Sequence, residues 1–298
     1  MSEDFEFFLA LTLNGASIGL MYSLIALGFV LVYKATDAIN FAQGEFVMLA
    51  GLIVAVSLSI EAMPLIVAIA IVIAVMIGFG FGLERVVLRP LLGRPVVAVI
   101  MATIGLAAVL RGLGPLIFGS ETRAVSLPVG DDPIVLGPAS LPQIQVVGAG
   151  VALLFFLAFS WFFKKSRMGV AMRAVADNQQ VAQAMGIDVE RYFALAWAMA
   201  GIVSALGGII WGSMLGVDVQ LALVGLKVFP VVILGGLDSI GGALIGGLII
   251  GIVESLAAGY LDPYVGGGTK DFAPYVLMIL VLMIRPYGIF GRRQIERV

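Results

Sequence analysis

The sequence predicts an all-α polytopic membrane protein with about eight or nine transmembrane helices, some of them short or interrupted. The first reason is composition, because 61% of the 298 residues are apolar and only 12% are charged, against about 45–50% and 25% in soluble domains. The second reason is the length of the uncharged runs, since a membrane-crossing helix needs roughly 20 residues. Runs at least that long lie at 7–33, 62–83, 133–163 and 192–217.

The apolar runs are continuous, whereas barrel strands would alternate apolar and polar residues over about ten positions. A helical architecture is therefore expected, and the chain 1–298 is treated as a single transmembrane domain. The short span at 222–237 either crosses the membrane or re-enters it. Hydropathy places the spans at 8–33, 41–60, 64–83, 96–118, 145–163, 192–216, 222–237, 240–258 and 273–290.

The third reason is the distribution of charge. Loops rich in Lys and Arg stay in the cytoplasm, and with nine crossings most of the 17 basic residues fall on one side. The other side is mainly acidic and holds only Arg123 and Lys270 as bases. This predicts an external N-terminus, a cytoplasmic C-terminus, a periplasmic segment at 119–144 and a cytoplasmic segment at 164–191. The basic residues predicted inside are Lys34, Arg85, Arg89, Arg94, Lys164, Lys165, Arg167, Arg173, Arg191, Arg285, Arg292, Arg293 and Arg297.

Several chemistries are excluded by what the sequence lacks. There is no His and no Cys, which removes thiol chemistry and the commonest metal ligands. There is also no G-x-x-x-x-G-K-[ST] phosphate loop, no H-E-x-x-H and no G-x-S-x-G motif. We expect no catalytic residue, no bound metal or cofactor and no nucleic-acid partner, so ATP-driven work would need another subunit.

Polar side chains inside spans are costly and usually face a cavity or a partner. One interpretation is that they line a permeation path; the other is that ion pairs, such as Lys227 with Glu254 or with Glu45, fix helix packing. Arg111 and Glu254 lie near span ends, from which they could reach the interface, and are assigned to the second interpretation, in which ion pairs fix helix packing. The residues assigned to the path are Asn40, Gln43, Glu45, Lys227 and Asp238.

Glycines are numerous, 38 in all, and small residues let helices approach closely in lipid. The run 235–251 holds Gly242-x-x-x-Gly246 and Gly247-x-x-x-Gly251. These pairs serve either helix packing within one subunit or a dimer face or pathway. The motif Asp-x-Ile-x-x-Ala occurs both at 37–42 and at 238–243, at predicted interruptions of the kind that transporter repeats carry; whether it marks a duplication is open.

The stretch 164–191 is a polar insertion in an otherwise apolar chain, and 170–185 is predicted to be one helix with a small-residue face. Gly186 is suited to end that helix and Asp188 to begin the next span. Such punctuation would hold the helix rigidly at the membrane surface, where it either docks on a soluble partner or lies on anionic lipid. The residues on the predicted face are Ala171, Val175, Asn178, Ala182 and Met185.

Five segments resemble a known family, the inner-membrane permeases of branched-chain amino acid ABC importers. The resemblance covers nearly the whole chain, in the same order. The segments are INFAQGEFVMLAG at 39–51, MATIGLAAVLRGLGPLIFG at 101–119, ADNQQVAQAMGIDVER at 176–191, FPVVILGGLDSIGGALIGG at 229–247 and IRPYGIFG at 284–291.

The resemblance implies one permease subunit of a heterodimer in a bacterial inner membrane. That heterodimer would sit on two cytoplasmic ATPases, which bind the ATP and Mg, and would receive leucine, isoleucine or valine from a periplasmic binding protein. The segment 182–186 looks like a diverged form of the loop that couples permease to ATPase. The residues that the resemblance and the punctuation assign to coupling are Arg173, Asn178, Ala182, Met185, Gly186 and Asp188.

The chain departs from the family pattern in three places. Ala-Asp-Asn at 176–178 stands where importers have an acidic-Ala-Ala triplet, no Ile-x-Leu-Pro follows Gly186, and Gln43 replaces a His that many relatives carry. Alternative functions are a related permease for urea, short amides or other amino acids, an ion-coupled carrier using Glu45, and a channel.

Overall fold

The computed structural model describes residues 3–91, 94–130 and 132–291. Asp131, Arg292, Arg293 and Arg297, which bear on the predicted charge asymmetry, lie outside them. Within the described residues the chain is mainly helical, which confirms an all-α polytopic membrane protein; the number of crossings and the orientation stay predictions. Six helices in the described part of the chain are long and apolar enough to span a membrane: α1 (Glu3–Thr36), α3 continued by η1 and η2 (Leu65–Leu91), α4 (Val96–Phe118), α5 (Gln143–Lys165), α8 (Val189–Leu215) and α10 (Ile240–Tyr260).

Three predicted spans are shorter in the structure: α2 (Gln43–Leu58), α9 (Leu223–Gly235), which follows the 3₁₀ turn η3 (Val219–Ala222), and α12 (Thr269–Ile284). With 13 residues at 1.5 Å per residue, α9 is about 20 Å long. The hydrocarbon core of a membrane is about 30 Å thick. The α-helical part of this span is therefore too short to cross such a core perpendicularly.

The chain forms two compact units that interleave along the sequence. Unit 1 comprises residues 1–26, 129–156 and 227–298, and unit 2 comprises residues 27–128 and 157–226. Because α1, α5 and α9 each contribute residues to both, neither unit is a continuous stretch of chain. That the chain forms a single transmembrane domain stays a prediction.

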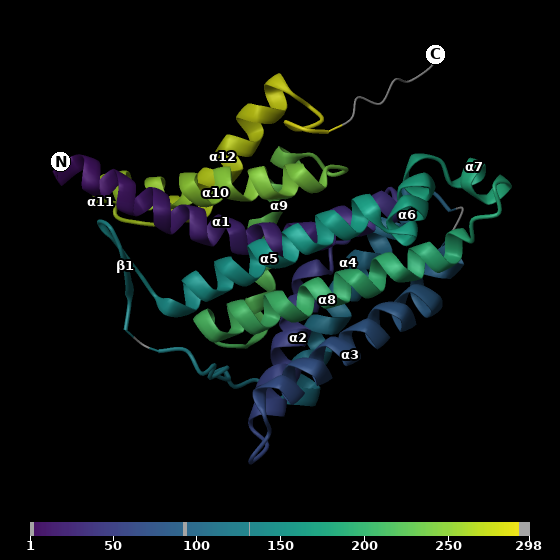
Figure 1. Ribbon diagram of the computed structural model, residues 1–298, viewed down its shortest axis with the longest axis horizontal. Helices are drawn as coiled ribbons and strands as arrows, with labels where there is room; N and C mark the ends of the chain where they lie inside the picture. The colour runs from purple at the N-terminus through teal and green to yellow at the C-terminus, as the bar shows by residue number, and fades with distance from the viewer. Residues whose placement is uncertain (1–2, 92–93, 131, 292–298) are drawn as a thin grey trace. The chain divides into compact units, whose positions relative to one another are not determined.

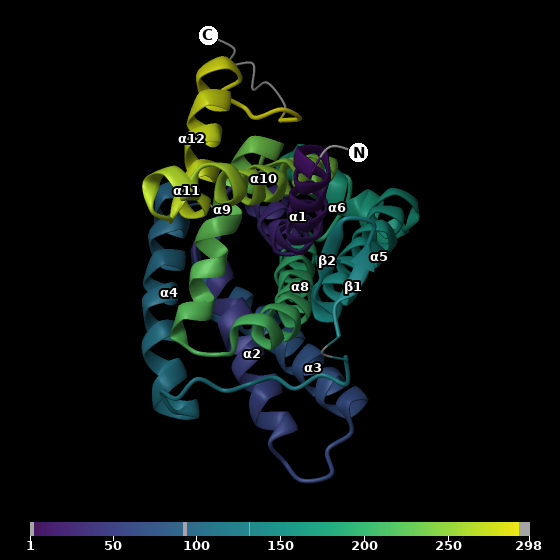
Figure 2. The same ribbon diagram turned by 90° about the vertical axis from the view of Figure 1, so that its left-hand side faces the viewer.

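Unit 2 is built on α2, α3 and α8, which lie side by side in Figures 1 and 2, with α4 also packed on α2. Glycine permits the closest of these contacts. A Cβ atom at Gly208 in α8 would lie 2.6 Å from the carbonyl oxygen of Val47 in α2. Phe46 and Trp197 fill the space beside this seam and are both fully buried, with ring centroids 6.1 Å apart.

Unit 1 packs the first part of α1 and the end of α9 against α10, with α12 also on α10. Added Cβ atoms at Gly247 and Gly251 would meet the backbone of α1, and those at Gly242 and Gly246 would meet the backbone of α9. Both Gly-x-x-x-Gly pairs thus serve close helix packing within one subunit, which was one of the two interpretations of the sequence.

Both Asp-x-Ile-x-x-Ala motifs follow helix ends. Asp37, with φ of +53°, comes directly after α1, and Gly236, with φ of +101°, follows α9 just before Asp238. The predicted interruptions are therefore present.

The predicted periplasmic segment holds a small hairpin that the sequence analysis missed. Strands β1 (Ile134–Leu136) and β2 (Ala139–Leu141) pair antiparallel around Gly137, whose φ is +62°. The remaining short helices are α6 (Arg167–Asp177), α7 (Gln179–Ala184) and α11 (Asp262–Val265).

Candidate functional site

One end of unit 2 gathers the segments that the charge count places in the cytoplasm. Residues of the α1 end, η1, the α4 start, α7 and the α8 start line a common cavity. Nearby, the Lys34 ammonium lies 6.0 Å from the ring centre of Phe163. Arg89 bridges η1 to α8, because its guanidinium lies 3.0 Å from Glu84 and 3.0 Å from Glu190. The first turn of α8 is thus tied to the end of α3.

At this end the predicted helix 170–185 is wrong, because the structure divides it into α6 and α7. The break is at Asn178, whose φ of −163° is extended, and whose side chain accepts a hydrogen bond from the Val181 N–H. Asn is among the best N-cap residues because its short amide competes with the backbone. Asn178 therefore starts a new helix and does not belong to one continuous face.

The residues of the predicted small-residue face do not share one environment, because some are buried and others are exposed. Val175 and Ala182 are each only 2% exposed and pack on their own chain. Exposed apolar surface on α7 comes instead from Val181, at 57%, and just beyond its end from Met185, at 77%. We therefore expect Ala182 to hold α7 in place and Met185 to be available to a partner; coupling itself stays a prediction.

Several contacts make α6 and α7 a rigid unit. The Arg173 guanidinium donates to the carbonyl oxygens of Phe163 and Lys164 at the end of α5. The Gln179 amide donates to the Ala35 carbonyl oxygen at 3.4 Å. The segment is thus fastened to both α5 and α1.

The segment ends with the helix-capping residues that the sequence predicted. Gly186 has φ of +81°, and the N–H groups of Ile187 and Gly186 donate to the carbonyls of Ala182 and Gln183. These two bonds form a Schellman motif, for which glycine is the usual C′ residue. Asp188 then accepts a hydrogen bond from the Arg191 N–H and caps α8. The predicted roles of Gly186 and Asp188 in the chain's local structure are confirmed.

Two of the predicted path residues form a buried amide network in unit 2. Asn40 and Gln43 are both 0% exposed. The Asn40 amide donates to the Gln43 side-chain oxygen at 3.1 Å, and the Gln43 amide donates to the Ser204 hydroxyl at 2.9 Å. The network joins α2 to α8 across the core, so in this conformation it fixes helix packing.

Glu45, two residues further along α2, pairs with Arg111 in α4. The Glu45 side chain is only 2% exposed, whereas that of Arg111 is 48% exposed. Arg111 thus forms an ion pair that joins α4 to α2, as the interpretation by helix packing predicted. A buried carboxylate without a counter-charge is strongly unfavourable, which accounts for the pairing.

Unit 1 contains a second charged cluster. Lys227 in α9 lies 2.7 Å from the Asp271 carboxylate in α12 and 3.7 Å from Glu254 in α10. The Tyr22 hydroxyl donates to the same Glu254 oxygen at 3.3 Å, while Oε2 of Glu254 is buried with no donor among the described residues. The pairing of Glu254 with Lys227 is the ion pair that the interpretation by helix packing predicted.

Asp238 lies half-buried in the turn between α9 and α10. The predicted path residues are divided between the two units: Asn40, Gln43 and Glu45 belong to unit 2, and Lys227 and Asp238 to unit 1.

The comparisons with known proteins bear on the whole chain. The family described as "Branched-chain amino acid transport system / permease component" matches residues 11–283. The chain belongs to this permease family. The high-affinity branched-chain amino acid transport system permease protein LivH is 36% identical in Escherichia coli K12 and 35% identical in Salmonella typhimurium, over the full length of both chains. The permease protein BraD of Pseudomonas aeruginosa is 31% identical over 96% of each chain.

A solved structure shows the same fold at much lower sequence identity. The chain titled "PsaBC from Streptococcus pneumoniae in complex with Fab" superimposes with a TM-score of 0.52 at 13% identity, over 93% of this permease and 92% of that chain. At this identity the likeness concerns the fold alone. The chain is a multi-pass membrane transport component and its family is not a family of enzymes.

Proposed function

We propose that this permease moves branched-chain amino acids into the cytoplasm as one subunit of an ATP-driven importer. Coupling to an ATPase is supported above all by two exposed apolar side chains, Val181 in α7 and Met185 directly after it. Hydrogen bonds fix this short helix at both of its ends. An apolar patch on a rigid polar segment favours a protein partner over lipid, because helices that insert into lipid carry Trp, Phe or Leu on the apolar face and residues 164–191 include none of these. The names of the LivH and BraD relatives support the substrate class.

The partners follow from the proposed role. Two cytoplasmic ATPases would bind ATP and Mg, a second, related permease would complete the membrane part as a heterodimer, and a periplasmic binding protein would deliver the substrate. The chain would be a multi-pass protein of a bacterial inner membrane, in contact with lipid, with the α6–α7 end facing the cytoplasm. The basic residues at that end support this orientation.

Transport would proceed by alternating access. Closure of the ATPases on ATP would move α7, and α8, which follows it after one glycine turn, would carry that movement into unit 2. A shift of the inward–outward equilibrium from 1:99 to 99:1 requires about 5.5 kcal/mol of differential binding. Nucleotide and docking together are a sufficient source of such an energy.

Within the membrane, Glu45, Lys227 and Asp238 are the proposed polar residues of the path. Asn40 and Gln43 would act there as positioning residues, since both side chains are buried and hydrogen-bonded. The mostly apolar spans suit an aliphatic side chain. Urea, short amides or other amino acids are alternative cargoes, whereas the pairing of Glu45 with Arg111 disfavours an ion-coupled carrier that uses Glu45.

The docking proposal is tested by placing charge on the exposed patch. Val181→Arg and Met185→Arg should each weaken the association with the ATPases by at least about 2 kcal/mol, roughly 30-fold, as expected for a central interface residue. Co-purification of tagged permease with ATPase measures this, and uptake should fall in parallel.

Met168→Arg is the matched control, because Met168 is an apolar residue of α6 that is also exposed, at 38%. All three variants should insert and melt like the wild type, since none of the three side chains is buried. Full co-purification of the ATPase with both α7 variants would refute docking at this patch.

A further inference from the structure

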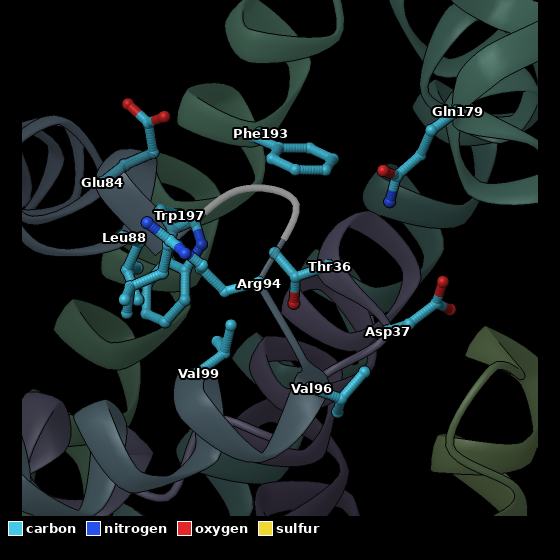
Figure 3. Close-up of a pocket in the computed structure, with 11 residues that line it drawn as sticks. Thr36, Asp37, Glu84, Leu88, Arg94, Val96, Val99, Gln179, Phe193 and Trp197 are labelled. Carbon is cyan, nitrogen blue, oxygen red and sulfur yellow. The ribbon is translucent and has the colours of Figure 1, made fainter.

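Helix α4 has a covered side and an open side within unit 2. It packs on α2 and η3, and in Figure 2 the helices α2, α3 and α8 all lie on one side of it. Near its start, Val96 and Val99 line the cavity shown in Figure 3. The buried residues of α4 recur at steps of three and four positions and are Thr103, Ala107, Leu110 and Gly114. The exposed side carries the one charged residue of the helix, Arg111.

The Arg111 guanidinium has hydrogen-bonding capacity that the fold does not use. Its side chain is 48% exposed, and within residues 3–91, 94–130 and 132–291 its partner is the Glu45 carboxylate. A guanidinium has five N–H donors, and one carboxylate accepts at most two of them in a bidentate pair. Arg111 therefore keeps donors for a second acceptor.

Helices α2 and α4 run side by side in the same direction. Near their starts, the N–H of Phe41, shortly before α2, donates to the Thr103 hydroxyl of α4 at 3.2 Å. Further along, a Cβ atom added at Gly114 of α4 would lie 3.1 Å from Cε of Met48 in α2. The ion pair lies between these two contacts along both helices.

This order places the ion pair deep in the membrane. The part of α4 from its start to Arg111 is about 22 Å long, and the part of α2 from Glu45 to its end is about 20 Å long, at 1.5 Å per residue. The start of α4 and the end of α2 lie on opposite sides of the membrane in the predicted topology. The pair is therefore well inside a hydrocarbon core about 30 Å thick.

Lipid alone does not account for an exposed guanidinium at this depth. Charged side chains within membrane spans almost always face the protein interior or a water-filled cavity. An unpaired arginine can extend along its helix to the membrane surface, but Glu45 holds this guanidinium beside α2. The open side of α4 therefore requires a polar neighbour, which the described residues do not provide.

The surface beside Arg111 is apolar and has room for a small ligand. Met101, Ile104 and Ala108 precede it at steps of three and four residues, so they share its side of the helix, and all three are exposed. An added Cβ atom at Gly112 meets nothing within 4 Å. A guanidinium at the end of such an apolar strip suits a molecule that has both a carboxylate and an aliphatic chain.

We infer that Arg111 binds the carboxylate of the amino acid in transit, on a water-filled path along the open side of α4, with the aliphatic side chain against Met101 and Ile104. The inference deepens the proposed function and rests on it for the cargo. Glu45 contributes by holding the guanidinium in place. Because urea and short amides have no carboxylate, Arg111 is then a residue that determines specificity.

Removal of both members of the ion pair separates stability from recognition. Glu45→Gln combined with Arg111→Gln leaves no buried charge unpaired, so this double variant should melt close to the wild type in detergent. Its ATP-driven uptake of L-leucine in the assembled importer should still be at least about tenfold slower, since a charged hydrogen bond to the cargo is lost. A stable double variant that transports leucine at the wild-type rate would overturn the inference.

Charge rescue tests the same residue from the other direction. The chain has no cysteine, so in the Glu45→Gln, Arg111→Cys variant, assembled with cysteine-free partner subunits, a methanethiosulfonate reagent modifies one position. A cationic aminoethyl group should restore uptake several-fold, whereas a neutral methyl or an anionic sulfonatoethyl group should not. Equal uptake with the cationic and the neutral group would show that the charge is not needed and would contradict carboxylate binding.

Ala108→Cys identifies what occupies the open side of α4 while Arg111 is intact. In the assembled importer its thiol should react with the aminoethyl reagent, because water lets a thiol ionise to the reactive thiolate. An excess of free L-leucine should slow the reaction several-fold, and isoamylamine, which lacks the carboxylate, should not. Protection by leucine should vanish when Glu45→Gln and Arg111→Gln are added.

The other possible neighbours of Arg111 give different results. A thiol at this position that reacts in the isolated permease but not in the assembled importer would mean that the second permease covers Arg111. A thiol that reacts in neither would mean that lipid covers it, and reaction that leucine leaves unchanged would mean water without a cargo site. Each of these results overturns the inference.

Leu113→Cys is the matched control, because Leu113 is exposed to a similar extent, 44%, and two residues along an α-helix point to nearly opposite sides. Its reaction should be slow and insensitive to leucine; leucine protection at both positions would contradict a site on the Arg111 side. Absence of ATP-driven uptake by the wild-type importer counts against the proposed function instead, and protection of the Ala108→Cys thiol by free leucine remains separately measurable.

Discussion

Each ionised or amide side chain that the sequence singled out in α2 has a specific partner in the structure. Glu45 pairs with Arg111. Gln43 accepts a hydrogen bond from Asn40 and donates one to Ser204. Few water molecules compete for hydrogen bonds inside a membrane protein. A polar side chain such as Glu45 can therefore be buried there only if a second side chain pairs with it. These residues therefore hold α2 to α4 and α8 as well as supplying polarity inside the membrane.

Removal of Arg111 tests this pairing. Arg111→Gln should destabilise the permease by about 2 kcal/mol, because it leaves the buried Glu45 carboxylate without its counter-charge; the value is at the low end for buried pairs since Arg111 is half exposed. Thermal unfolding in detergent measures the loss. Glu45→Gln combined with Arg111→Gln should recover most of it, and a double variant as unstable as Arg111→Gln alone would contradict the account.

The sequence could reveal the first member of each pair but not the second. Gln43 and Glu45 stand out because polar residues are rare in spans. Their partners lie 161 and 66 residues away along the chain, and no local pattern encodes such a distance. Ser204 is an ordinary residue in an apolar helix, and the sequence did not identify Glu45 as the partner of Arg111.

The close packing of helices in unit 1 depends on glycine at defined faces of α10. Gly247 faces α1, and an added Cβ atom there would lie 2.5 Å from the Gly19 carbonyl oxygen; an added Cβ at Gly241 meets nothing within 4 Å. The Ser23 hydroxyl would lie nearer still, and a backbone carbonyl such as that of Gly19 cannot move aside as a flexible side chain can.

Gly247→Leu should therefore separate α1 from α10 and reduce the yield of folded permease strongly, since overpacking a tight contact costs about 1–3 kcal/mol or more. Gly241→Leu, six residues earlier in the same helix, should have little effect. The amount of monodisperse protein in size-exclusion chromatography measures both. Equal behaviour of the two variants would show that α1 and α10 do not meet through Gly247.

Long elements were more predictable than short ones. The boundaries of α4 match the predicted span 96–118 residue for residue, because Pro95 precedes it and Gly119, with φ of +87°, ends it. Residues 170–185 were predicted as one helix although Asn178 divides them, since the periodicity outweighed the capping signal. The β1–β2 hairpin was missed because two three-residue strands leave no measurable alternation.

At the scale of the whole molecule, two interleaved units share three helices, and the segment proposed to dock on the ATPases belongs to unit 2. Whatever moves α7 moves the start of α8 with it, because only the Gly186 turn and the Asp188 cap separate them. The sequence predicted this lever from Gly186 and Asp188. It could not predict that the exposed contact residues are Val181 and Met185, since burial depends on how α6 and α7 fold back onto α1 and α5.

The central claim is that this permease imports branched-chain amino acids with energy from ATP. The most direct measurement is uptake of radiolabelled L-leucine into proteoliposomes that hold this permease, its partner permease, the two ATPases and the binding protein. Uptake should require ATP hydrolysis and the binding protein, and it should continue when an ionophore collapses the proton gradient. Uptake without ATP, or its loss on collapse of the gradient, would contradict the claim and favour an ion-coupled carrier.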